Sequence, residues 1–135
     1  MNKKISLIII AIIITLSLSI IANVNNIDQN TIEQTFVINA IYYSNDDYVE
    51  ISFEDKSHKT NHITLEVLGM PTSFHKEYLS SEFLERIQFS SPPEYGWQSI
   101  PITLVVDHAE FGIIDIKTEI RPLGEIPAKI IFSKG

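Results

Sequence analysis

Cysteine is absent from the 135 residues of this chain, and glycine occurs only five times, always singly. The absence of cysteine excludes disulfides, thiolate nucleophiles, iron–sulfur clusters and cysteine-ligated zinc. Isolated glycines exclude the glycine-rich loops that bind phosphate groups, and no G-x-S-x-G motif marks a serine nucleophile. We therefore expect a protein that is not an enzyme and needs no cofactor.

Basic residues are scarce after the N-terminus. Residues 23–135 contain 8 Lys and Arg against 17 Asp and Glu, a net charge of −9. Such an acidic surface repels phosphate backbones, so we expect no binding of nucleic acid. Internal repeats and low-complexity segments are also absent, and the length allows one small domain.

Charged side chains are missing altogether from residues 5–22, which read ISLIIIAIIITLSLSIIA. As a helix this run would span about 27 Å, close to the thickness of the hydrocarbon core of a membrane. Lys3 and Lys4 precede the run, a pattern typical of exported prokaryotic proteins, and the positive-inside rule keeps them in the cytoplasm. The membrane-facing residues would include Ile5, Ile9, Ile13, Leu16 and Ile20.

Two interpretations of residues 1–22 stay open. An uncleaved transmembrane anchor needs about 18 apolar residues, which the run supplies. A secretory signal peptide needs small residues before its cleavage site, and Ser17 and Ser19 meet that requirement. Either interpretation places the acidic domain outside the cytoplasm, tethered to the membrane or secreted.

The rest of the chain divides into a polar stalk and a domain rich in strands. Residues 23–35 are rich in Asn and Gln, which is typical of a spacer. Residues 36–135 alternate between apolar and polar side chains, which predicts half-buried strands. The predicted strands cover 36–43, 48–53, 63–67, 100–107, 112–121 and 129–133, with 54–61 as a hairpin loop. Residues 77–89 fit a helix or a strand, and we predict mainly strand.

Six to eight short strands separated by turns predict an all-β fold, a small antiparallel immunoglobulin-like β-sandwich behind one N-terminal apolar helix. The turn signals are Asn45-Asp46-Asp47, Pro92-Pro93, Gly112 and Pro122-Leu123-Gly124.

Candidate metal ligands in the sequence are four histidines and an acidic turn. None of the four histidines shows a local metal-binding spacing. A copper site would have to join distant strands, and we take His75 and His108 as its candidate ligands. Asp46 and Asp47, followed by Glu50, offer oxygen ligands for calcium, although the same residues form ordinary turns.

Aromatic residues gather in two turn-rich stretches, SFHKEY at 73–78 and SPPEYGW at 91–97. Exposed aromatic side chains at loop tips make good contact residues, so we take Ser73, Phe74, Tyr95 and Trp97 as candidate binding residues. The alternative is that these residues close the open end of the sandwich and that Trp97, the only tryptophan, fills the core.

The motif order VLGMPTSF at 67–74, PPEYGW at 92–97 and the predicted strand 100–107 resembles the YEATS domain family over about residues 63–106. Members of that family are immunoglobulin-like sandwiches, and the eukaryotic members bind acylated lysine in a small aromatic pocket. The resemblance implies that Ser73, Phe74 and Trp97 line a pocket. Pro71 and Gln98 stand where the family has His and Gly.

Taken together, these patterns predict an exported, membrane-anchored interaction module that contacts an unidentified protein partner. It would be an accessory subunit of a membrane complex or a component of the cell envelope. The alternative function is an extracytoplasmic protein that binds a ligand or a metal ion, copper or calcium.

Overall fold

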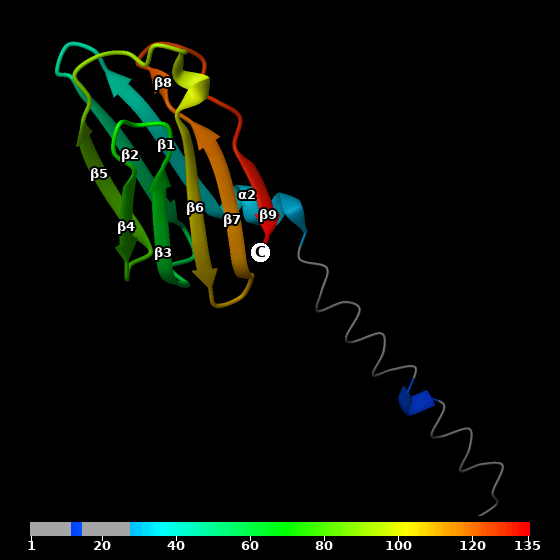
Figure 1. Ribbon diagram of the computed structural model, residues 1–135. Coiled ribbons are helices and arrows are strands. Elements are labelled where there is room, and N and C mark those ends of the chain that lie inside the picture. The colour runs from blue at the N-terminus through cyan, green and yellow to red at the C-terminus, as the bar shows by residue number, and fades with distance from the viewer. Residues whose placement is uncertain (1–11, 15–27) are drawn as a thin grey trace, which may run out of the picture.

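The computed structural model describes residues 12–14 and 28–135, and residues 28–135 form two β-sheets packed face to face (Figure 1). The all-β sandwich predicted from the sequence is confirmed. The strands are β1 Phe36–Tyr43, β2 Tyr48–Asp55, β3 Thr60–Val67, β4 Phe74–Tyr78, β5 Glu82–Gln88, β6 Pro101–His108, β7 Gly112–Glu119, β8 Arg121–Pro122 and β9 Ile131–Lys134. A helix, α2 (Gln29–Thr35), and a 3-10 turn, η1 (Trp97–Ser99), complete the described elements.

The first sheet has the strand order β5-β2-β1-β8 and the second has the order β4-β3-β6-β7-β9. All pairs are antiparallel except β1 with β8, which run parallel over two residues. The orders β1-β2-β5 and β4-β3-β6-β7 correspond to strands A-B-E and C′-C-F-G of the immunoglobulin sandwich. Because β8 and β9 are short additions at sheet edges, the described domain has nine strands where six to eight were predicted.

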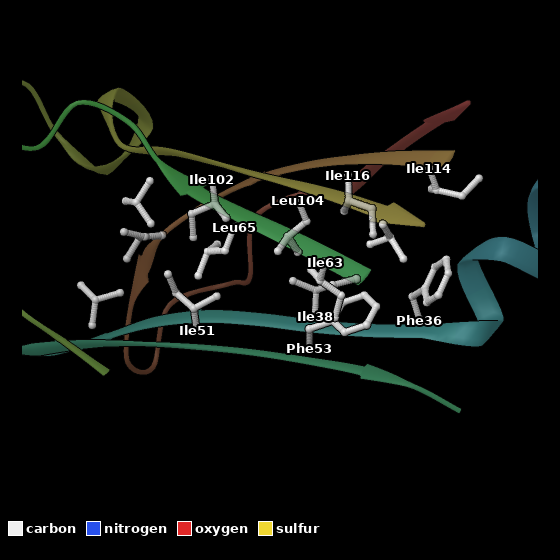
Figure 2. Packing of buried hydrophobic residues seen from close by; sticks show 14 of the residues in the cluster. Phe36, Ile38, Ile51, Phe53, Ile63, Leu65, Ile102, Leu104, Ile114 and Ile116 are labelled. Atoms are coloured by element: carbon white, nitrogen blue, oxygen red, sulfur yellow. The ribbon is translucent and has the colours of Figure 1, made fainter. Parts of the chain in front are cut away.

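The core lies between the two sheets because alternate side chains of each strand point inward (Figure 2). Ile51 and Phe53 come from β2, and they face Ile63 and Leu65 of β3 across the sandwich. The buried set is dominated by isoleucine, whose branched side chains pack well on a pleated sheet.

The predicted hairpin between β2 and β3 is wrong. β2 pairs with β1 and β5, whereas β3 pairs with β4 and β6, so the connection crosses from one sheet to the other. A polar loop between two alternating strands has the same sequence pattern in a hairpin and in a crossing between sheets. The strands also extend further than expected, to Asp55 and from Thr60, because these two polar residues are buried.

The ambiguous stretch 77–89 is strand, as predicted, but it includes a change of sheet. Its first residues end β4 in one sheet, and β5 follows in the other sheet after a turn at 79–81. The rings of Tyr78 and Phe83 stack across this change of sheet with centroids 4.1 Å apart. The Tyr78 hydroxyl donates to the Glu85 carboxylate at 2.5 Å, and burial together with this bond raises the pKa of Tyr78.

The polar stalk predicted over 23–35 does not extend to Thr35. Residues 29–35 form α2, whose N-cap Asp28 accepts a hydrogen bond from the Asn30 backbone N–H. Ile32 is 2% exposed and belongs to the core, and Gln29 donates to the Phe132 carbonyl of β9 at 3.4 Å. One isoleucine in a polar segment was too weak a signal to predict this helix.

The predicted apolar helix over residues 5–22 lies outside the described residues except for 12–14. Within the part of the chain that the structure describes, none of the helices has the length and hydropathy of a membrane span.

Candidate functional site

The β3–β4 loop and the segment between β5 and η1 lie at the end of the sandwich opposite α2 (Figure 1). A cleft lies between them. We call it the loop-end cleft. One wall is residues 69–72 of the β3–β4 connection, the other is residues 88–95 before η1, and Ser99 and Ile100 complete its lining. Its volume is about 670 Å³, and sites of about 300–1,000 Å³ are typical of ligand binding.

Gly69 determines how closely the two walls approach each other. Its φ angle is +78°, in the left-handed region, and a Cβ at this position would collide with the carbonyl oxygen of Ser99. The neighbouring Leu68 backbone N–H donates to the Pro101 carbonyl at 3.0 Å. The β3–β4 loop therefore lies directly on the start of β6 only because residue 69 lacks a side chain.

Two aromatic residues beside the cleft have different roles. Trp97 is half-buried, with its ring 4.5 Å from Tyr42 and 5.6 Å from Phe89, so it anchors η1 to the core. Tyr95 lines the cleft and is 84% exposed. Such an exposed ring is free to contact another molecule.

Of the four candidate binding residues, Tyr95 lines the loop-end cleft and the other three do not. Ser73 is exposed just beyond the wall residue Thr72, and Phe74 begins β4 and packs against the core. Trp97 lies behind the cleft and lines, with Tyr95, a smaller hollow of about 260 Å³. Sequence reasoning missed Met70 and Phe89, apolar residues close to glycine and proline in the two walls.

His75 and His108 are not brought together. His75 pairs with Glu66 near one end of β3, whereas His108 pairs with Thr60 at the other end. Six residues of extended strand separate those two positions, about 20 Å at 3.3 Å per residue. His75 is exposed on an edge strand, whereas His108 is buried.

His75 instead lies beside carboxylate side chains on the outer face of its sheet. Its Nδ1 is 3.2 Å from the Glu66 carboxylate and its Nε2 is 3.8 Å from Glu77, and His62 lies 3.5 Å from Glu77. Within the part of the chain that the structure describes, no group of three or more such side chains has the arrangement to hold a metal ion.

The acidic turn between β1 and β2 has a structural role, because it accepts hydrogen bonds from the end of β5 and the residue that follows it. Asp47 adopts a positive φ of 54°, and its carbonyl accepts hydrogen bonds from the Phe89 N–H at 2.8 Å and from the Gln88 side chain at 2.9 Å. Glu50 pairs with Arg86 at 2.9 Å on the outer face of the sheet. The turn thus supports the wall of the loop-end cleft that begins at Gln88.

A buried polar cluster lies at the other end of the sandwich, near α2, and sequence reasoning did not find it. The Asp55 carboxylate accepts hydrogen bonds from the Ser57 hydroxyl at 2.6 Å and from the Thr60 hydroxyl at 2.8 Å. The backbone N–H groups of Ser57 and Lys59 donate to the same carboxylate at 2.8 and 2.9 Å. His108 Nε2 lies 3.0 Å from the Ser57 hydroxyl and 3.3 Å from Asp55.

The cluster contains the residue types of a nucleophilic triad, but its protons are in the wrong places for catalysis. His108 Nδ1 accepts from the backbone N–H groups of Glu110 and Phe111, both at 3.1 Å, so the ring proton is on Nε2. A general base would need a free lone pair on the nitrogen that faces Ser57. The cluster is a structural connection between the two sheets.

The environment of the cluster fixes its charges. Burial by itself would raise the pKa of Asp55, but the hydrogen bonds from Ser57, Thr60 and Lys59 outweigh it and lower the pKa to about 2. Burial lowers the pKa of His108 despite the nearby Asp55 carboxylate. At neutral pH the cluster therefore holds a carboxylate and a neutral imidazole.

Ser73 and Lys76 have the S-x-x-K spacing of some serine enzymes. Lys76 Nζ donates to the Glu85 carboxylate at 2.8 Å, so its partner is an acidic side chain and not a serine. The motif thus carries no catalytic arrangement here.

Comparisons with protein-family models and with curated proteins find no match to this chain.

Proposed function

We propose that the chain is an exported interaction module, tethered through residues 5–22, that binds another protein with the loop-end cleft and performs no catalysis. The observation that carries this proposal is Tyr95, an aromatic side chain 84% exposed in the wall of an open cleft. Exposed aromatic residues beside apolar walls are the usual energetic centres of protein interfaces.

The position of the cleft supports the proposal. The apolar run precedes α2 in the sequence, and the loops that line the cleft are at the opposite end of the sandwich (Figure 1). A strand of eight residues such as β6 separates the two ends, a length of about 26 Å. A partner at the cleft would therefore meet the face that points away from the membrane.

Site-directed photocrosslinking of the full chain tests the proposal. A photoreactive residue replaces Tyr95 in one variant and Leu79 in the other, because Leu79 is equally exposed at 86% but lies after β4 at the α2 end. We expect one discrete adduct from position 95 and none from position 79. Equal adducts from both positions, or none from position 95, would overturn the proposal.

A further inference from the structure

Among the residues that line the loop-end cleft, there is no Lys, Arg or His, and Glu94 is the one charged side chain. Pro71, Pro92 and Pro93 also belong to the walls, and proline has no backbone N–H to donate. The walls therefore carry one negative charge and no positive charge. An anionic ligand would find no counter-charge in this lining.

The two arginines nearest the cleft are each paired with a carboxylate. Arg121 and Glu125 line the adjoining hollow, but Arg121 is engaged with Glu119 at 2.7 Å. Arg86, on the strand that leads into the cleft, is paired with Glu50. Residues 28–135 carry a net charge of −9, and such a field raises the local concentration of cations.

The apolar part of the lining suits a long basic side chain. Tyr95 presents an exposed ring, and the face of an aromatic ring attracts a cation. Met70 and Phe89 provide apolar walls against which the methylene stem of a lysine or arginine packs. The cleft therefore matches both parts of a basic side chain.

We propose that the loop-end cleft binds an extended, lysine- or arginine-rich segment of the partner protein, an inference that rests on the proposed function. The cleft runs between two loops and is open to solvent, which suits a peptide rather than a small ammonium ion. A small ammonium ion is usually held in an enclosed cage of several aromatic rings, whereas Tyr95 is the exposed aromatic residue of this lining.

The test measures binding of labelled peptides to the purified full chain by fluorescence anisotropy. The probes are an alternating Ala-Lys peptide and its Ala-Gln and Ala-Glu counterparts of equal length. We expect the Ala-Lys peptide to bind at least about tenfold more tightly than the others at low salt, and its affinity to fall as salt is added.

Substitutions separate the cleft from the general acidity of the surface. We expect Glu94→Gln and Tyr95→Ala each to weaken binding of the Ala-Lys peptide about fivefold. Glu82→Gln is the matched control, because it removes the same charge at the far end of β5 and should leave binding unchanged. Circular dichroism checks that each variant is folded.

Two results would overturn the inference. One is equal affinity for the Ala-Lys and Ala-Gln peptides, and the other is an equal effect of Glu94→Gln and Glu82→Gln. Neither result bears on the crosslink from position 95, so failure of the basic-segment inference is distinguishable from failure of the proposed function.

Discussion

The carboxylate of Asp55 lies 3.3 Å from Nε2 of His108, and both side chains are fully buried. Asp55 ends β2 in one sheet and His108 ends β6 in the other. Their contact, together with the Ser57 bridge, fixes the two sheets to each other at the α2 end. The loop-end cleft lies at the opposite end of the sandwich.

Acidification should reduce the free energy of unfolding in two steps. The pKa of His108 is lowered from 6.5 in the folded state by burial, so the unfolded chain takes up a proton first and stability falls as the pH drops below about 6.5. The pKa of Asp55 is lowered from 3.8 to about 2, so its contribution is present above about pH 4 and lost between about pH 4 and pH 2. The Asp55 step amounts to about 2 kcal/mol, measurable by urea unfolding across pH.

Single substitutions assign the two steps. Asp55→Asn should cost about 1–3 kcal/mol at neutral pH and remove the step below about pH 4, because an amide cannot satisfy all four donors of the cluster. His108→Gln should remove the step that begins near pH 6.5, whereas His75→Gln on the exposed strand should retain it. If the Asp55→Asn variant still lost stability below about pH 4 as the unmodified protein does, the assignment of that step to Asp55 would be contradicted.

Ile32→Ala should lower the free energy of unfolding by about 2–4 kcal/mol, because it leaves a cavity beneath α2. Glu33→Ala on the exposed side of the same helix should change it by less than about 0.5 kcal/mol. Chemical denaturation of the two variants measures the difference. Equal, small effects would mean that α2 is a separate spacer after all.

Gly69→Ala should destabilise the domain more than Gly124→Ala does. Both glycines have a positive φ, which costs an alanine about 1 kcal/mol, but only at Gly69 does the new methyl group meet backbone. We expect an additional cost of about 1–3 kcal/mol at Gly69. Thermal unfolding of the two variants compares them, and equal midpoints would show that the loop moves aside freely.

Trp97→Ala and Tyr95→Ala should separate folding from binding. Trp97 packs on Tyr42 and Phe89, so its truncation should cost about 2–3 kcal/mol of stability. Tyr95 is exposed, so its truncation should change stability by less than about 0.5 kcal/mol and still reduce partner capture. A strongly destabilised Tyr95→Ala would assign that ring a structural role.

The strands were predictable because burial on one face leaves a local pattern of period two. The alternation around Ile51 and around Ile114 is visible in a short window of sequence, and both residues are in the core. The crossing between β2 and β3 was not predictable, since strand partners are chosen by residues far away in the sequence. Ile32 shows the same limit, because its burial depends on the sheets that α2 covers.

The candidate site was predictable in part. The run from Pro92 to Trp97 combined turn residues with aromatic ones, and it does form one side of the loop-end cleft and its support. The opposite wall around Met70 gave no comparable signal in the sequence. Met70 reaches the cleft because Gly69, which has no side chain, packs against the Ser99 carbonyl. Which aromatic ring is exposed was likewise decided by packing on Tyr42.

The sequence by itself determined the class of fold, the acidity of the domain and the absence of thiol chemistry, because composition and alternation are local properties. The tertiary structure alone decided that Asp55 meets His108, that Trp97 is an anchor while Tyr95 is exposed, and that the walls of the cleft lack basic side chains. Each of these depends on residues distant in the sequence being brought together by the pairing of strands, and no local pattern records that pairing.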